Sequence, residues 1–258
     1  MDRGLFDLRG QVALVTGAAG GLGEAIALAY AAQGADLVLS DRHDGALAPI
    51  VTRCRAMGVR ADALTADLAD AGAAAGLGAR AADVFGRIDT LVCNAGMQGP
   101  AGPSLAVKED DWARVFRVNL ESAHALCAAL VPAMARRGAG SVILMASIAA
   151  LRGNRAIGLY GMTKAALSQL ARNLAVEWGP QGVRANAIAP GLIRTPLASG
   201  LIADGAFMAR RLAMTPLRRV GEPHEVAGVA VMLAAAAGGF ISGQTLVVDG
   251  GTLVSDGG

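Results

Sequence analysis

Short apolar runs alternate with helix-length segments along the chain, and this alternation limits the possible folds more than any other feature. The apolar runs are predicted to be strands at Val12–Thr16, Asp36–Ser40, Arg60–Ala63, Thr90–Cys93, Ser141–Met145, Arg184–Ile188 and Thr245–Val248. The segments of helical length are about 22–33, 44–57, 70–85, 110–137, 157–178 and 222–236. Strands that alternate with helices build βαβ units, and strands that are apolar almost throughout are buried on both faces. We therefore predict an α/β fold, a doubly wound parallel sheet of about seven strands with helices on both faces.

Composition favours a single domain over residues 1–258. Hydrophobic residues make up 53% and charged residues 17% of the chain, which is enough apolar material for a large core. The net charge is +2 with scattered basic residues, so binding to nucleic acid is not indicated. Residues 191–221 have no clear periodicity, and long irregular loops in compact domains are usually functional. We expect a mobile substrate lid at about 192–220.

Neither a secretion signal nor a membrane span is indicated, and a cytoplasmic protein is expected. Residues 226–248 carry no charge, but Gly238-Gly239 and Ser242-Gly243-Gln244 interrupt them, which predicts a helix, a turn and a strand. No CxxC spacing suggests a disulfide framework or a zinc site, so the three cysteines are expected in the core. The three histidines form no ligand pattern, and no metal is expected. These residues are Cys54, Cys93, Cys127, His43, His124 and His224.

A glycine-rich segment, Thr16-Gly17-Ala18-Ala19-Gly20-Gly21-Leu22-Gly23, follows the first strand and opens the first helix. Glycines allow the backbone to turn sharply and to approach a pyrophosphate, while the helix N-terminus offers free N–H groups. An ordinary strand–helix turn also uses glycines, so this segment alone leaves both interpretations open.

Two carboxylates follow predicted strands at the same edge of the sheet. Asp41 lies 24 residues beyond Gly17, where a carboxylate can accept hydrogen bonds from the ribose diol of an adenosine. Asp67, in Ala66-Asp67-Leu68, could accept from an adenine amino group. Each could instead cap the helix that follows it.

Tyr160 and Lys164 are four residues apart in a predicted helix, and Ser147 precedes Tyr160 by thirteen residues. Residues i and i+4 share a helix face, so the ammonium is expected to lie near the phenol. A nearby positive charge favours phenolate and lowers the tyrosine pKa, which suits a general acid or base. Ser147 follows a strand and can enter the same cleft. A pair on a solvated helix surface is the simpler interpretation of Tyr-x3-Lys taken alone.

Taken in order, the motifs resemble those of the short-chain dehydrogenase/reductase family in its single-domain form. The resemblance runs from Leu8 to Gly251 and implies a Rossmann-like fold. It rests on Thr16-Gly17-x3-Gly21-x-Gly23, Asn94-Ala95-Gly96, Asn119, Ser147, Tyr160-x3-Lys164, Pro190-Gly191 and Val247-Val248-Asp249-Gly250-Gly251.

This resemblance implies a catalytic role for four residues. Tyr160 would be the general acid in reduction and the general base in oxidation. Lys164 would lower the pKa of Tyr160 and hold the nicotinamide ribose. Ser147 would hydrogen-bond the substrate oxygen, and Asn119 would anchor a water behind Lys164.

The implied cofactor-binding residues are Gly17, Gly21, Leu22, Gly23, Asp41, Arg42, Asp67, Leu68, Asn94, Ala95, Gly96, Tyr160, Lys164, Pro190, Gly191, Ile193 and Thr195. The implied substrate pocket, most of it apolar, contains Met97, Gln98, Ile148, Ala149, Asn154, Leu159 and Leu192. An apolar pocket suits a medium-sized ketone or secondary alcohol better than a polyol. Arg152 and Arg155 could meet an anionic substrate, or could simply be solvated loop arginines.

The expected function is hydride transfer between a nicotinamide dinucleotide and a ketone or secondary alcohol, as in a short-chain alcohol dehydrogenase or carbonyl reductase. The cofactor is expected to be NAD because Asp41 would repel a 2′-phosphate, although Arg42 leaves NADP possible. The alternatives are an acyl-thioester 3-ketoreductase that uses NADPH and a non-catalytic dinucleotide-binding sensor. The family resemblance also implies a homotetramer with a small-molecule substrate and no membrane partner.

Overall fold

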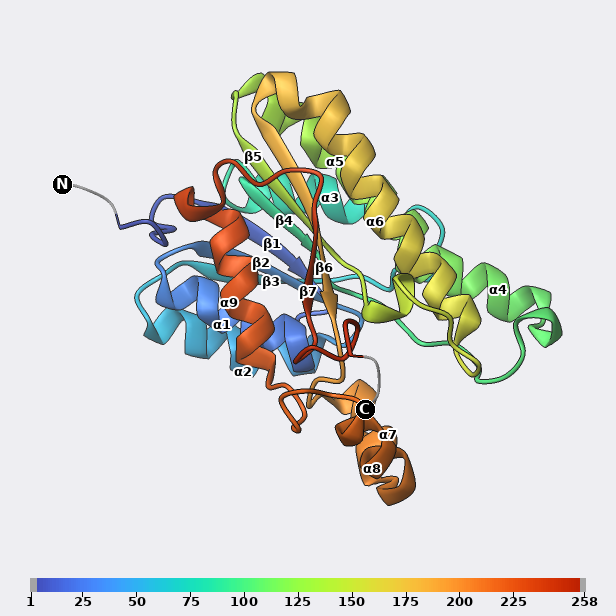
Figure 1. Cartoon of the computed structure of the whole chain (residues 1–258). Coiled ribbons are helices and arrows are strands. Elements are labelled where there is room, and N and C mark those ends of the chain that lie inside the picture. Colours follow the sequence, from blue (N-terminus) through green and yellow to red (C-terminus); the bar gives the residue numbers. More distant parts are fainter. Residues whose placement is uncertain (1–3, 256–258) are drawn as a thin grey trace.

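The seven predicted strands form one parallel sheet in the order β3-β2-β1-β4-β5-β6-β7 (Figure 1). The computed structural model describes residues 4–255. The strands are β1 Val12–Thr16, β2 Asp36–Asp41, β3 Ala61–Thr65, β4 Thr90–Cys93, β5 Gly140–Met145, β6 Val183–Pro190 and β7 Thr245–Val248. The doubly wound α/β fold is thus confirmed.

Central strands are apolar almost throughout because both of their faces are covered. Leu14 of β1 is aligned with Val38 of β2 on one side and with Leu91 of β4 on the other, and all three side chains are fully buried. A parallel sheet with helices on both faces leaves no solvated side to such strands. This arrangement is the physical basis of the pattern seen in the sequence.

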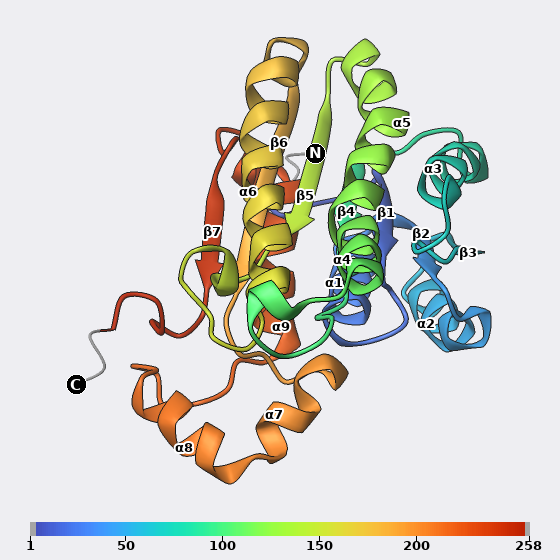
Figure 2. The ribbon, with the colours of Figure 1, turned by 90° about the vertical axis from the view of Figure 1, so that its right-hand side faces the viewer.

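Two layers of helices enclose the sheet (Figure 2). The layer on one face consists of α1 Gly21–Ala32, α2 Asp44–Ala56 and α9 Pro223–Ala234. The layer on the other face consists of α3 Ala73–Val84, α5 Ser122–Arg136 and α6 Gly158–Trp178. Tyr30 is buried between α1 and α9, and its hydroxyl donates to the Ala230 carbonyl at 3.0 Å. Each layer therefore has its own apolar core against the sheet.

The predicted helix 110–137 is divided by a π turn. Its parts are α4 Glu109–Phe116, the π turn η2 Arg117–Glu121 and α5. A π turn inserts one extra residue into a helix and is found mostly at functional sites. Here it carries Asn119, one of the residues that the sequence indicates for the site.

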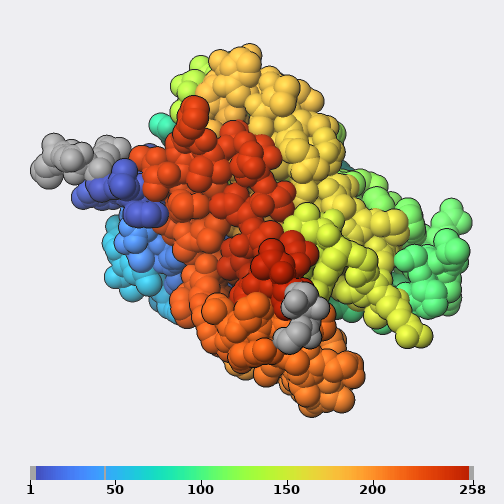
Figure 3. Space-filling view, viewed as in Figure 1, coloured from blue at the N-terminus to red at the C-terminus, as the bar shows by residue number. Residues whose placement is uncertain are grey.

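The stretch expected to be irregular, 191–221, contains two short helices, so that part of the prediction was wrong. They are α7 Ser199–Ala203 and α8 Gly205–Ala213. Asp204 explains the second, because its side chain accepts from the Phe207 N–H at 3.0 Å and caps the helix. Both helices lie beyond the carboxyl ends of the strands and form a separate lobe beside the C-terminal segment (Figures 2 and 3).

Short 3₁₀ turns join several of the elements. They are η1 Ser104–Ala106, η3 Ile148–Ala150, η4 Gly179–Gln181, η5 Pro196–Ala198 and η6 Ala236–Gly238. The charge-free stretch 226–248 forms most of α9, a turn that includes η6, and β7, as predicted. The three cysteines are free and buried in the core, also as predicted.

One continuous helical stretch, 109–136, is long and apolar enough to cross a membrane by length and composition alone. Of its most apolar 18-residue window, 44% is buried inside the structure. Leu126 and Leu130 of α5 belong to the core on that face of the sheet. In this structure the stretch is therefore a layer helix of an α/β domain.

Candidate active site

A cleft of about 660 Å³ lies beyond the carboxyl ends of the strands. The chain runs from β1 to β2 and β3 on one side of the sheet, and then returns to β4 on the other side of β1. Loops that leave β1 and β4 therefore part in opposite directions and leave a crevice between them. Ligands of doubly wound sheets bind at such a switch point.

The glycine-rich turn forms one wall of the cleft and has no space for side chains at Gly17 and Gly23. Gly17 has a φ of +65°, and a Cβ on it would lie 2.8 Å from the Ala95 Cα. A Cβ on Gly23 would lie 2.0 Å from the Gly17 carbonyl oxygen. Gly23 thus serves the close packing of α1 and does not itself line the cleft. No side chain caps the N-terminus of α1, which leaves its first N–H groups for an anion.

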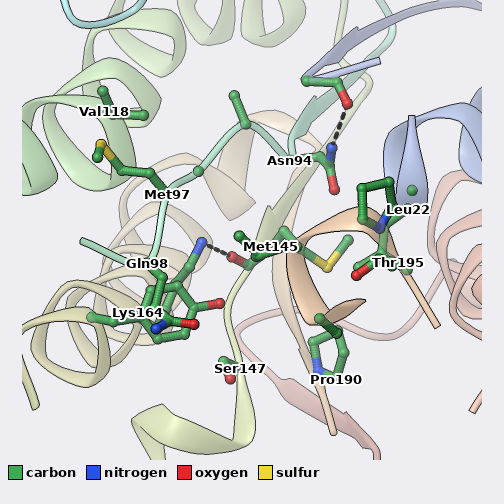
Figure 4. Close-up of a pocket in the computed structure, with 18 of the residues that line it drawn as sticks. Leu22, Asn94, Met97, Gln98, Val118, Met145, Ser147, Lys164, Pro190 and Thr195 are labelled. Carbon is green, nitrogen blue, oxygen red and sulfur yellow. Dashed lines mark hydrogen bonds between the residues drawn. The ribbon is translucent and has the colours of Figure 1, made fainter. Parts of the chain in front are cut away.

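A polar clamp joins the turn after β1 to the loop after β4. Asn94 donates from its side-chain Nδ2 to the carbonyls of Thr16 and Gly17, both at 3.0 Å, and Figure 4 draws one of these bonds. The Thr16 hydroxyl accepts from the N–H groups of Asn94 at 3.1 Å and Ala95 at 3.2 Å. The two walls of the crevice are therefore fixed relative to each other.

Two carboxylates at one end of the cleft are held by backbone donors. Asp41 accepts from the Ala19 N–H at 3.1 Å and from the Arg42 N–H at 2.8 Å, and Asp67 accepts from the Ala69 N–H at 2.9 Å. The exposed Arg42 side chain donates from Nε to His43 Nε2 at 3.0 Å. Each carboxylate retains lone pairs for a ligand. An anion-binding turn beside carboxylates that can accept from a diol fits a dinucleotide.

Lys164 is the most buried charged side chain of the cleft, with 3% of its surface exposed. Its Nζ donates to the Met145 carbonyl at 2.7 Å (Figure 4) and lies 5.4 Å from the centre of the Tyr160 ring. Both residues project from the first turns of α6 into the cleft, as their spacing predicts. The Ser147 hydroxyl, just after β5, accepts from the Ala149 N–H at 3.1 Å and faces the same space. Ser147, Tyr160 and Lys164 therefore converge.

The pKa of Tyr160 differs from the expectation that Lys164 lowers it. Burial raises the pKa of Tyr160, and the Ser147 hydroxyl opposes that change only in part. Burial also lowers the pKa of Lys164 to about 8. Desolvation penalises the charged form of both groups, because phenolate and ammonium each lose water in the cleft wall. The Lys164 ammonium lies over the Tyr160 ring, and from there its charge does not reverse the effect of burial on the pKa of Tyr160.

Asn119 lies behind the cleft and does not line it. Its Nδ2 donates to the Met97 carbonyl at 2.9 Å and to the Thr163 hydroxyl at 3.0 Å, and its Oδ1 accepts from the Met97 N–H at 2.8 Å. A Cβ on Gly96 would lie 3.1 Å from Lys164 Nζ and 3.3 Å from Asn119 Oδ1. Asn119 thus anchors the Gly96–Met97 loop and lies next to the ammonium.

Most other predicted site residues line the cleft. They are Gly21, Leu22, Leu68, Ala95, Gly96, Met97, Gln98, Ile148, Ala149, Asn154, Pro190, Gly191, Leu192, Ile193 and Thr195, in addition to Gly17, Asp41, Arg42, Asp67, Asn94, Ser147, Tyr160 and Lys164. Leu159 does not line it, which corrects its assignment to the substrate pocket. It is 2% exposed and faces Gly99, because the first turn of α6 directs it away from the cleft.

Several residues of the cleft were not found from the sequence. Met145 supplies the carbonyl that holds Lys164, and Thr16 supplies the hydroxyl of the polar clamp. Arg211 reaches the cleft from α8. Of the two arginines considered from the sequence, Arg152 lines the cleft, whereas Arg155 is exposed and lies outside it. Asp204 as a helix cap is the signal that would have indicated α8.

The fold and the cleft define a dinucleotide-binding α/β protein with a Ser, Tyr and Lys at the inner end of its site. A family model described as enoyl-(acyl carrier protein) reductase matches residues 17–252. Relatives that span nearly the whole chain are oxidoreductases by name. The chain belongs to the short-chain dehydrogenase/reductase family of oxidoreductases.

Three relatives illustrate the similarity. An uncharacterized oxidoreductase of Mycobacterium tuberculosis is 41% identical over 96% of this chain and 94% of its own. L-rhamnose 1-dehydrogenase (NAD(P)(+)) of a Sphingomonas species is 37% identical over 96% of this chain and 98% of its own. The crystal structure of a gluconate 5-dehydrogenase from Burkholderia cenocepacia, in complex with NADP and tartrate, is 35% identical. It has a TM-score of 0.92 over 97% of this chain and 98% of that one.

Proposed function

We infer that this protein transfers a hydride between a nicotinamide dinucleotide and a ketone or secondary alcohol, with Tyr160 as the general acid and base. The observation that carries this function is the convergence of Ser147, Tyr160 and Lys164 at the inner end of the cleft. The simpler interpretation, a Tyr and Lys pair on a solvated helix surface, does not account for this convergence. A buried ammonium is retained only at a cost in stability, which favours a functional role for Lys164.

Tyr160 holds the proton that the reaction moves. The cofactor supplies or accepts the hydride when bound. In reduction the Tyr160 hydroxyl gives its proton to the carbonyl oxygen, and in oxidation the phenolate takes the alcohol proton. The raised pKa of Tyr160 keeps the proton on the hydroxyl at neutral pH, the form that reduction requires.

Ser147 and Lys164 position and stabilise the reacting groups. The Ser147 hydroxyl donates to the same substrate oxygen, whose negative charge grows in the transition state. The Met145 carbonyl fixes Lys164 by accepting a hydrogen bond from one of its three N–H groups at 2.7 Å. The other two can bind ribose hydroxyls and return a proton toward Tyr160. Asn119 supports this by holding the loop that touches the ammonium.

We expect NAD to be preferred over NADP. The Asp41 carboxylate is fixed at the wall of the cleft by two backbone N–H groups, whereas Arg42 is exposed and turned to His43. A 2′-phosphate would meet the carboxylate before it met the guanidinium. Against this preference, one relative is named for both cofactors and another was crystallised with NADP. The expected preference is therefore moderate.

A second candidate function is reduction of the 3-keto group of an acyl thioester. The family model bears the name of an enoyl-(acyl carrier protein) reductase, which favours an acyl thioester as the substrate, although an enoyl reductase acts on a C=C bond. Names of individual relatives favour small polyhydroxylated substrates, such as rhamnose and gluconate. Assays with a 3-ketoacyl thioester and with free secondary alcohols separate the two functions.

Tyr160→Phe tests the proposed function directly. The change removes the transferable proton and little else, so kcat should fall by about 10²–10⁴ while cofactor affinity is unchanged. The other tyrosine of the chain provides a matched control. Tyr30→Phe removes a buried hydroxyl bond between α1 and α9, and should lower stability without lowering kcat per folded molecule. Near-normal turnover by the Tyr160 variant would refute the assignment.

Assembly into a homotetramer is also proposed. Large apolar side chains are exposed on the chain as it stands, and Val176, Phe240 and Val254 each have more than three-quarters of their surface in solvent. Contiguous exposed apolar surface is uncommon on monomers and marks interfaces. The turn that follows α9 adjoins α6, because a Cβ on Gly243 would lie 3.4 Å from the Ala175 side chain. Phe240 and Val176 therefore lie on the same flank of the molecule.

A further inference from the structure

Two arginines from distant parts of the chain line the cleft. Arg152 belongs to the loop between η3 and α6, five residues after Ser147. Arg211 comes from α8, in the lobe beyond the carboxyl ends of the strands. Both side chains are half-buried. They are close enough for the charge of Arg152 to act on Arg211.

Neither arginine has a carboxylate partner among residues 4–255. Nine other arginines form ion pairs in this part of the chain, and Arg152 and Arg211 are not among them. Of the acidic residues that line the cleft, Asp41 ends β2 and Asp67 follows β3, and both lie at the other end, beyond the glycine-rich turn. Arg211 does lie over the Phe207 ring, with Cζ 5.5 Å from its centre.

The two charges repel each other in a partly desolvated space. Burial and the charge of Arg152 both lower the pKa of Arg211, and Asp249 opposes them only in part. The Asp249 carboxylate accepts from the N–H groups of Gly251 at 2.8 Å and Leu253 at 2.6 Å and forms no ion pair with Arg211. A protein that brings two unpaired guanidinium groups together gains stability when an anion bridges them.

Two amide side chains line the same cleft as this arginine pair. Asn154 uses its Oδ1 to accept from the N–H groups of Ala156 at 3.0 Å and Ile157 at 3.1 Å, and its Nδ2 has no acceptor in the described structure. The Gln98 side chain, which also lines the cleft, has no hydrogen-bond partner among the described residues. These groups suit the hydroxyls of a polar substrate. They revise the expectation, based on the apolar members of the pocket, that polyols are disfavoured.

We propose that the substrate is a small hydroxy acid or oxo acid whose carboxylate binds between Arg152 and Arg211. This inference rests on the proposed function, because it places the carboxylate beside the oxygen held by Ser147 and Tyr160. The planar fork of each guanidinium matches a carboxylate in a bidentate manner. Since Arg211 belongs to α8, binding the acid also fastens the lobe of α7 and α8 over the cleft and excludes water from it.

Binding of tartrate and of threitol, its neutral counterpart without carboxylates, tests the arginine pair. Calorimetry on the enzyme saturated with oxidised cofactor should show tartrate binding at least tenfold more tightly than threitol. Arg152→Gln and Arg211→Gln should each weaken tartrate binding about tenfold or more, the usual effect of losing a charge-assisted hydrogen bond. Arg155→Gln is the matched control and should change nothing, since Arg155 is exposed outside the cleft. Equal binding of tartrate by wild type and by the double variant, which carries both Arg152→Gln and Arg211→Gln, would overturn the inference.

Turnover separates this inference from the proposed function. With a panel of hydroxy acids and the corresponding primary amides, kcat/KM should be at least tenfold higher for an acid, and the double variant should abolish that advantage. If the amides react as well as the acids, the inference fails and the proposed function stands. If tartrate binds through the arginines but no alcohol of the panel, charged or neutral, reduces the cofactor, the proposed function fails and the anion site stands.

Discussion

Lys164 allows a sharp test of the electrostatics of the cleft, because burying its ammonium lowers the free energy of unfolding by an amount that depends on pH. Burial lowers its pKa from 10.5 to about 8. Between these two pH values the unfolded chain binds a proton at this position and the folded chain does not. The free energy of unfolding contributed by Lys164 therefore rises with pH across this window.

The size of the effect follows from the displacement of the pKa. It corresponds to about 3 kcal/mol, as an order of magnitude. Below about pH 8 both states are protonated and the full cost of burying the charge is present. Above pH 10.5 both states are neutral and the cost is gone. Burial raises the pKa of Cys54 to about 11 and also raises that of Tyr30, which acts in the opposite direction in the same range. A comparison with a variant lacking the lysine is therefore required.

Lys164→Met removes the titration and leaves the other groups in place. Urea unfolding of wild type and variant at intervals from pH 7 to 11 gives the difference in unfolding free energy. This difference, wild type minus variant, should rise by up to about 3 kcal/mol between pH 8 and 10.5 and be flat below pH 8. Lys108, the only other lysine, is exposed, and Lys108→Met is the control that should give a flat difference throughout. A flat difference for Lys164→Met would refute the claim that burial sets its pKa.

Three further predictions address cofactor choice, the loop beside the ammonium and assembly. Asp41→Ser should move the ratio of kcat/KM for NAD over NADP toward NADP by about tenfold or more, since one like-charge contact is lost; an unchanged ratio would contradict the role of Asp41. Gly96→Ala should lower cofactor affinity about tenfold, because its Cβ would lie 3.1 Å from Lys164 Nζ; a variant that binds cofactor normally would show that the loop can move. Light scattering at micromolar concentration should give four times the mass of the chain, and a monomer would refute the tetramer.

The strands could be predicted because their burial dictates their composition. Val12–Thr16, Thr90–Cys93 and Thr245–Val248 match the structure at both ends. β6 extends two residues further than predicted, to Pro190, whose alignment with Val248 depends on the neighbouring strand and not on local sequence. The Tyr160 and Lys164 pair was also predictable, since helical spacing alone places both on one face.

Features that depend on contacts between distant segments could not be predicted. The helix α8 is an exception, because its cap Asp204 is a local signal, but Asp204-Gly205 is also typical of a turn and the helix was missed. Without α8, nothing in the sequence relates Arg211 to Arg152, 59 positions earlier. The direction of the Tyr160 pKa shift was missed for a similar reason. Spacing reveals a nearby ammonium, but only the packed cleft reveals how much water both groups lose.

Both carboxylates of the cleft lie at one end, and the topology of the sheet explains why. Asp41 ends β2 and Asp67 follows β3 on one side of the switch point, while Arg152 follows β5 and Arg211 lies on α8, on the other side. The glycine-rich turn after β1 separates the two ends. Loops on either side can therefore change in sequence independently. An acidic end that accepts from a ribose diol and a cationic end that binds an acid need no shared residue, so one chain can fix its cofactor with the first and its substrate with the second.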